Sequence, residues 1–200
     1  MTAITLPTSP APRDEISPRL LDFGRETDPA RGGVNQSIGR LGSRFELDVV
    51  LPAMKHADAR AWLAARLRSR TEKVTVIYRW PQTPLEGGDV GTPLVKGAGQ
   101  TGSVLTLDGL TPALVIPALT PFSFVVDSHH YLHLTSDTAT VDGTGEVDLP
   151  IGPLLRASPA DNTAVEFEAP VIEGFIRGDL DWTLKRLSTI GISFTLYENR

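Results

Sequence analysis

The feature that most constrains the fold is a change of hydrophobic period within residues 44–80. From 44 to 49 apolar and polar residues alternate, which places Phe45, Leu47 and Val49 on one face of a predicted strand. The period then lengthens to that of a helix and shortens again at the end of this stretch. Strand, helix and strand predict a sheet covered by one helix. This unit is too small to be a domain alone, so its missing strands must come from elsewhere in the chain.

The predicted helix covers about residues 56–70. Ala59, Leu63 and Leu67 recur every fourth residue, with Trp62 beside them, and form its expected apolar stripe. The arginines are expected mainly on the solvated face, toward the C-terminal end, where the helix dipole favours cations. An interface with an acidic partner is the alternative. The candidate interface residues on this helix are Arg66, Arg68 and Arg70.

Composition narrows the class of protein. The chain has 200 residues, a length that fits one domain or two small ones, and 40% of its residues are hydrophobic. A net charge of -5 argues against general nucleic-acid binding, and the absence of cysteine excludes disulfides, zinc–thiolate sites and cysteine nucleophiles. We expect no secretion signal and no membrane span, hence synthesis in a cytoplasm. The 18 glycines and 16 prolines between short apolar runs favour a mainly β protein.

Residues 93–169 carry little charge and contain many short strand-like runs, which predict a small closed barrel or sandwich. The pairs Asp108-Gly109 and Asp142-Gly143 are expected at hairpin turns. The last alternation, at 190–196, matches the strand at 44–49 in pattern, and we expect the two to pair.

These patterns predict a mainly β fold with one helix, in which a split β-sandwich-like domain carries an inserted small β-barrel. Residues 19–81 and 163–200 are expected to form the split domain, and residues 93–162 the barrel. Residues 1–18 are expected to be an extended arm, either a loose tail or an arm that orders on a neighbouring subunit. Residues 25–39 are expected to be a loop.

Two segments resemble ligand sites. The run from Gly97 to Gly102 matches G-x-G-x-x-G, but a strand-like sequence follows it instead of a helix, so we predict a glycine-rich turn between barrel strands. His129 and His133 would share a strand face on the order of 13 Å apart, too far for one metal, while His130 points the other way. A metal site would need a carboxylate such as Asp127, and a polar barrel rim is the preferred interpretation.

The sequence lacks a signature of nucleophilic catalysis, since no G-x-S-x-G is present. Carboxylates such as Glu46 with Asp48, or Glu166 with Glu168, follow the pattern of solvated strand faces. A glycosidase pair stays open as a weak alternative, because distances in space cannot be read from a sequence. We expect that the protein is not an enzyme, and that it has no catalytic residue, no bound metal and no cofactor.

A proline-rich segment at 149–159 packs apolar residues into an irregular stretch. Its prolines should bar it from a central strand. It is expected either to close the barrel or to form a seam between subunits. The candidate interface residues in it are Pro153, Leu154 and Arg156.

Residues 95–105 and 147–159 resemble motifs of tail proteins from long non-contractile-tailed bacteriophages and related prophages. The order of elements over about 20–198 is similar to that of a distal tail protein. The resemblance implies a structural virion protein at the tail tip, without catalytic residues. Its copies would form a ring, usually a hexamer, between the tail tube protein and the baseplate or tail-tip hub.

The resemblance also implies a division of labour. The split domain would make the ring, and the inserted domain, similar to an oligonucleotide/oligosaccharide-binding barrel in several family members, would project outward toward receptor-binding or fibre proteins. Free sheet edges suit such a ring, and an acidic lumen would let DNA pass without binding. The alternatives are another minor tail or hub protein, or a carbohydrate-binding module that uses Tyr131, His129 and Trp182.

Overall fold

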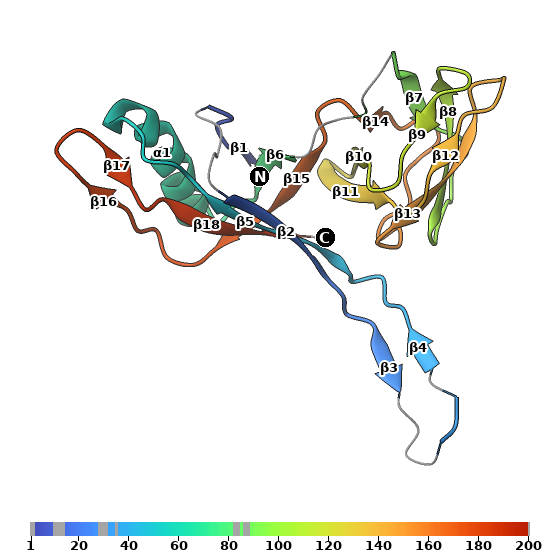
Figure 1. The fold of residues 1–200 in the computed structure, drawn as a ribbon, viewed down its shortest axis with the longest axis horizontal. Helices are drawn as coiled ribbons and strands as arrows, with labels where there is room; N and C mark the ends of the chain where they lie inside the picture. The colour runs from blue at the N-terminus through green and yellow to red at the C-terminus, as the bar shows by residue number, and fades with distance from the viewer. Residues whose placement is uncertain are drawn as a thin grey trace.

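The computed structural model describes residues 3–9, 15–27, 32–34, 36–81, 85 and 89–199. The chain is mainly β with one helix, as predicted, and contains two six-stranded sheets (Figure 1). We call the first the outer sheet and the second the barrel. Among the described residues, no helix is long and apolar enough to cross a membrane.

Strands from early and late parts of the chain lie together in the outer sheet. In spatial order they are β1 (Ile4–Thr5), β6 (Val76–Arg79), β15 (Val171–Arg177), β18 (Ser193–Glu198), β5 (Arg44–Val50) and β2 (Glu15–Leu21). The predicted pairing of the 44–49 strand with the last alternation is confirmed, because β5 and β18 are antiparallel neighbours. Phe45, Leu47 and Val49 are buried, as their alternation predicts.

Helix α1 (His56–Glu72) packs on the outer sheet through part of the stripe that we predicted, since Ala59 and Trp62 are buried and Leu63 packs against the core, but Leu67 does not belong to it. Its buried residues are Ala59, Trp62, Arg66 and Ser69, whereas Leu67 is 58% exposed. The reason is geometric. At 3.6 residues per turn, spacings of three and four align residues 59, 62, 66 and 69, while a strict repeat of four drifts away from that line. Trp62 packs against Tyr78 and Phe194, with ring centroids 6.1 and 6.2 Å apart.

The barrel follows the predicted short strands closely. Its order is β14 (Val165–Glu166), β10 (Pro121–Val126), β11 (His129–Thr135), β13 (Val147–Gly152), β8 (Val104–Leu110) and β7 (Gly91–Val95). A bridge between Leu94 and Ala164 brings the two ends of this sheet together. The pair β9 (Val115–Ile116) and β12 (Ala139–Thr140) adds a small ribbon.

Turn chemistry in the barrel is partly as predicted. The Gly97–Gly102 run joins β7 to β8, and the carboxylate of Asp142 accepts N–H bonds from Thr144 and Glu146 in a turn. The turn predicted at Asp108-Gly109 is wrong, because both residues lie within β8. A pairing irregularity opposite β7 accommodates Gly109, whose φ of 71° favours glycine and whose Cβ position would lie 2.4 Å from a carbonyl oxygen.

The exclusion of residues 149–159 from a central strand is also wrong. Strand β13 contains Pro150 and lies between β11 and β8. The strand tolerates this proline because its two neighbours pair with different parts of it. β8 pairs with residues 147–150, and β11 pairs with Ile151 and Gly152, beyond the proline.

The N-terminal prediction needs correction as well. Ile4 and Leu6 are buried against the chain's own outer sheet, where β1 runs parallel to β6, so residues 3–9 are neither a loose tail nor an arm on a neighbour. β2 begins at Glu15, so residues 15–18 belong to the sheet. The part of the predicted arm at residues 1–2 and 10–14 lies outside the described residues.

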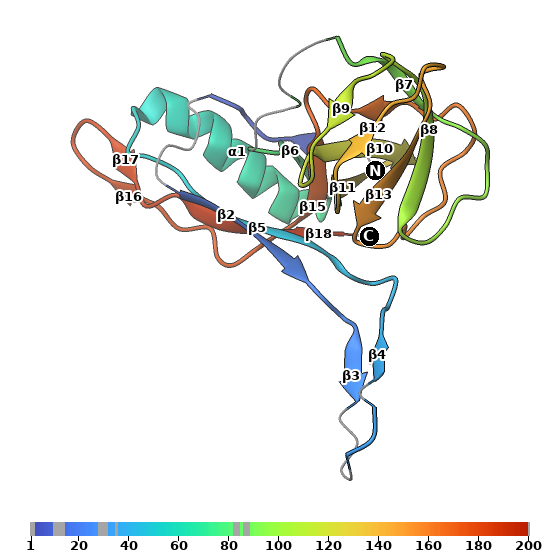
Figure 2. The same cartoon turned by 45° about the vertical axis from the view of Figure 1, so that its right-hand side comes forward.

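Two hairpins leave the outer sheet. Residues 25–39, predicted to be a loop, contain β3 (Arg25–Thr27) paired with β4 (Gln36–Ile38), and this hairpin extends away from the body of the protein (Figure 2). The second hairpin, β16 (Thr183–Leu184) with β17 (Thr189–Ile190), lies at the end of the sheet remote from the barrel (Figures 1 and 2).

The helix face can be tested with two substitutions. Trp62→Ala should lower the free energy of unfolding by about 3–5 kcal/mol, because it removes a fully buried ring and leaves a cavity. Leu67→Ala should change it by less than about 0.5 kcal/mol, since that side chain is largely in solvent. Urea denaturation of both variants measures the difference. Equal losses would restore the stripe predicted from the sequence.

Candidate functional site

The barrel meets the outer sheet along one edge of β11. Over residues 129–133, no described strand pairs with this edge of β11. The strand that pairs with the rest of the edge, β13, reaches only Leu134 and Thr135. Two carboxylates from the outer sheet occupy the place instead. Glu173 accepts the N–H of His130 at 2.9 Å, and Glu198 accepts the N–H of Leu132 at 3.1 Å. The carboxylates thus satisfy backbone donors that a sheet edge would leave open.

Glu198 is the more deeply buried of the two and has no exposed surface. Its Oε2 accepts the N–H of Phe45 at 2.9 Å, whereas Nη2 of Arg156 donates at 2.5 Å to Oε1, the oxygen that also accepts the N–H of Leu132. The Arg156 side chain is only 5% exposed and lies over the ring of Tyr131. Burial raises the pKa of Glu198, and the Arg156 guanidinium and the two backbone N–H groups act against that rise.

Glu173 is held by a second set of donors. It accepts the hydroxyl of Thr75 at 2.6 Å and lies 3.0 Å from Nδ1 of His129. Burial raises the pKa of Glu173, but the hydrogen bonds from Thr75, the backbone of His130 and His129 outweigh burial and lower it overall. Both carboxylates of the junction are therefore buried and well bonded, which gives the contact structural character, whereas Nε and Nη1 of Arg156 are buried without a described hydrogen-bond partner.

The candidate interface residues fall into two groups. Arg66 and Arg156 have buried side chains and Pro153 is buried, so these three do not lie on the surface, where a contact with a partner was expected. Arg66 donates to the carbonyl of Asp179 at 3.0 Å. The reason is that distant parts of the same chain supply their partners, which local sequence patterns cannot reveal.

The other three candidates stay accessible. Leu154 and Arg70 are half-buried, and Arg68 is exposed and forms an ion pair with Glu72 at 2.7 Å along the helix. Arg68 with Glu72 is a helix-surface pair of the ordinary kind, worth little on its own.

The histidines do not form a polar rim. His133 is fully buried in the barrel, where its ring stacks on Phe122 and Phe124 with centroids 5.9 and 5.4 Å away. Its Nδ1 donates to the carbonyl of Pro153 at 3.0 Å. Burial lowers the pKa of His133 to about 3, so the ring is neutral at ordinary pH. Within the described part of the chain, no group of three or more His, Cys, Asp or Glu residues is placed to hold a metal.

The glycine-rich run is closed by its own glutamine. The Gln100 amide donates to the carbonyls of Lys96 and Thr106, and its oxygen accepts the N–H of Thr106 at 2.7 Å. The N–H of Gly97 is taken by Asp161 at 2.7 Å. A strand follows the run, as predicted, so the helix N-terminus that a pyrophosphate would require is not at this position.

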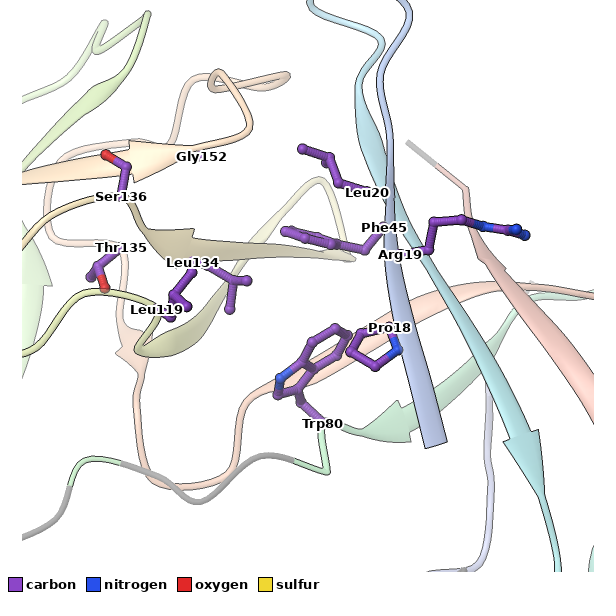
Figure 3. Close-up of a pocket in the computed structure, with 10 residues that line it drawn as sticks. All are labelled: Pro18, Arg19, Leu20, Phe45, Trp80, Leu119, Leu134, Thr135, Ser136 and Gly152. Carbon is purple, nitrogen blue, oxygen red and sulfur yellow. The ribbon is translucent and has the colours of Figure 1, made fainter. Parts of the chain in front are cut away.

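An apolar groove of about 400 Å³ lies between β2 and the barrel (Figure 3). Residues of both sheets contribute to it. Its lining is mostly hydrophobic, and consists of Pro18, Arg19, Leu20, Phe45, Trp80, Leu119, Leu134, Thr135, Ser136 and Gly152. Arg19 is paired with Glu46 at 2.6 Å, which leaves the groove suited to an apolar occupant.

No protein-family model matches this chain, and a search of curated proteins finds no significant match.

Large exposed apolar side chains gather on the two hairpins. On and beside β3 and β4, Val34 is 89% exposed, Ile38 55% and Leu41 58%. On the β16–β17 hairpin, Leu187 is 82% exposed. Tyr131, by contrast, is only 5% exposed, so it cannot stack on a sugar as the carbohydrate-binding alternative requires. The groove and the hairpins are what this structure offers to a partner.

Sequence reasoning missed the two glutamates of the junction, although one signal was available. Glu198 continues the inward-facing phase of Phe194 and Leu196, so an acid stands where the pattern demands an apolar residue. A charged residue in a buried phase indicates a buried partner elsewhere. Glu173 gives no such warning.

The junction predicts strong coupling between Arg156 and Glu198. Arg156→Met should lower the free energy of unfolding by about 3–5 kcal/mol, because it leaves a buried carboxylate unpaired. The double variant Arg156→Met/Glu198→Gln should lose clearly less than the sum of the two single losses. Urea denaturation of the four proteins gives the coupling. The matched control, Arg68→Met with Glu72→Gln, should show no measurable coupling, and additive losses at the junction would contradict the buried pair.

Burial of His133 predicts an acid-dependent loss of stability. A histidine in the unfolded chain has a pKa of about 6.5, so on acidification the unfolded state binds the proton first. The free energy of unfolding should therefore fall as the pH drops from about 6.5 toward 3, by up to about 1.4 kcal/mol per pH unit from this group. Denaturation at a series of pH values should show a shallower slope for His133→Phe than for the unchanged protein. Identical slopes would mean that this ring is not buried as described.

Proposed function

We propose that this chain is a structural ring-forming subunit, a distal tail protein that joins a bacteriophage tail tube to the baseplate or tail-tip hub. The motif resemblance at residues 95–105 and 147–159 supports the identity of the family. The observation that carries the proposal is the β3–β4 hairpin, which leaves the body of the protein with exposed apolar side chains (Figure 2).

A hairpin of this kind needs a surface to pack on. It has three described residue pairs, and two strands alone are at best marginally stable in water. Its exposed Val34, Ile38 and Leu41 would gain free energy by leaving water on a neighbouring molecule. The hairpin continues from β2, the terminal strand of the outer sheet, whose outer edge is a template for another chain. These features support contact between copies.

The proposed assembly is a ring of identical subunits, a hexamer in the resembling family, located at the tail tip of a virion and made in the host cytoplasm. Its partners would be the tail tube protein and the hub, with a receptor-binding or fibre protein against the barrel. DNA would pass through the ring without specific binding, which the net charge of -5 favours. The role requires neither a catalytic residue nor a cofactor. Another minor tail or hub protein is the runner-up.

The hairpin can be tested by charge substitution. Val34→Asp/Ile38→Asp should convert the oligomer largely to monomer, because each carboxylate must be desolvated in the proposed contact. The matched control Val104→Asp/Val115→Asp places the same charges on barrel positions that are 44% and 52% exposed, and should leave the oligomer intact. Native mass spectrometry gives the copy number, and circular dichroism checks that each variant is folded. An unchanged protein that is monomeric at every concentration would refute the proposal.

A second measurement addresses location. Electron microscopy of particles with this subunit labelled should show the label at the tail tip. A label elsewhere on the tail, with a ring still formed in solution, would favour the runner-up.

A further inference from the structure

The β16–β17 hairpin presents an apolar tip to solvent. Two residue pairs join its strands, and the N–H of Lys185 bonds to the carbonyl of Ser188 at 2.8 Å across the turn. Leu187 is 82% exposed and Leu184 67%, with Trp182 at 43% near the base. Such a short ribbon with large apolar side chains in water is a candidate for coverage by another molecule.

The turn of the hairpin is held in place by the helix. Nε2 of His56, at the start of α1, lies 3.0 Å from the carbonyl oxygen of Lys185. The tip is therefore oriented relative to the helix and the sheet.

The apolar groove lies at the other end of the same sheet, where the barrel meets it (Figure 3). Phe45, at the start of β5, lines the groove, while the β16–β17 hairpin departs from the region beyond Val50, at the end of β5. Two of its apolar residues are accessible, Leu119 at 61% and Leu20 at 50%. At about 400 Å³ the groove has the size of sites that bury a drug-sized molecule, which is more than one leucine side chain requires.

Charge next to the lining residues in the sequence favours a basic occupant. The one charged residue of the lining, Arg19, is already paired with Glu46. Two exposed carboxylates, Asp22 and Asp137, stand within two residues of the lining residues Leu20 and Ser136. Hydrogen bonds from the backbone of Gly24 and the hydroxyl of Ser43 lower the pKa of Asp22 and keep it ionised.

We infer that the tip of the β16–β17 hairpin of one copy docks in the apolar groove of the next copy. Leu187 enters the groove, and Lys185 and Arg186 at the tip face Asp22 and Asp137. Because tip and groove lie at opposite ends of one molecule, the contact is head-to-tail and leaves a free tip and a free groove on every pair. Such a contact closes into a ring when the rotation allows. This inference rests on the proposed ring and specifies its contact.

The absence of cysteine allows a direct test by crosslinking. Leu187→Cys and Leu119→Cys are made as separate variants of the full chain, co-expressed, and oxidised mildly after purification. The expected product is a disulfide-linked dimer that contains one of each variant. Leu187→Cys co-expressed with Val115→Cys is the matched control, since Val115 is similarly exposed but lies in the barrel ribbon outside the groove lining. It should give little dimer.

Affinity gives an independent readout. Leu187→Asp should weaken assembly about tenfold or more, whereas Val115→Asp should not change it. Native mass spectrometry over a concentration series measures both, and circular dichroism confirms that each variant is folded.

The outcomes separate the two proposals. A ring that forms without the 187–119 crosslink above the control, or that tolerates Leu187→Asp, overturns this contact and leaves the ring proposal standing. A 187–187 crosslink in the Leu187→Cys protein alone would indicate a symmetric contact and also overturns it. An unchanged protein that never assembles removes both.

Discussion

The edge of β11 is the constraint on which the rest of the structure depends. A backbone N–H that faces another part of the protein instead of water must find an acceptor, and here the acceptors are side chains of the outer sheet. Glu198 alone bonds to β11, to β5 and to Arg156, which follows β13. One carboxylate therefore joins four segments that are far apart in the sequence. The barrel and the outer sheet have largely separate hydrophobic cores, but Leu132 of β11 packs in the core of the outer sheet, so a polar and an apolar contact join the two.

The sequence predicts the position of a residue in the fold well where nearby residues in the chain determine its surroundings, and poorly where distant residues do. The alternation in β5 and β18 was readable because each strand has one face on a core, and the same holds for the barrel strands. Arg66 and Arg156 were misjudged as surface residues. Their hydrogen-bond partners, Asp179 and Glu198, each lie more than forty positions away in the sequence. Pro150 was misjudged because tolerance of a proline depends on which neighbour pairs at that residue, which is a property of the register.

Both hairpins are continuations of strands in the outer sheet. β3 and β4 extend the pair β2 and β5, and β16 and β17 lie between β15 and β18 in the chain. Each parent pair contributes side chains to the core under α1, and the hairpins project from these strands (Figure 2). The sequence did not predict this, because the hairpins bury little and carry no hydrophobic period.

The polar junction and the proposed assembly are connected through the groove. Phe45 and Trp80 line it from the outer sheet, and Leu119 and Leu134 line it from the barrel (Figure 3). The groove therefore needs both sheets, and the hydrogen bonds of Glu173 and Glu198 to β11 are among the contacts that hold them together. A ring closes only when every subunit repeats the same angle to the next. In the proposed assembly, buried carboxylates that lock the barrel onto the sheet would keep that angle constant from one copy to another.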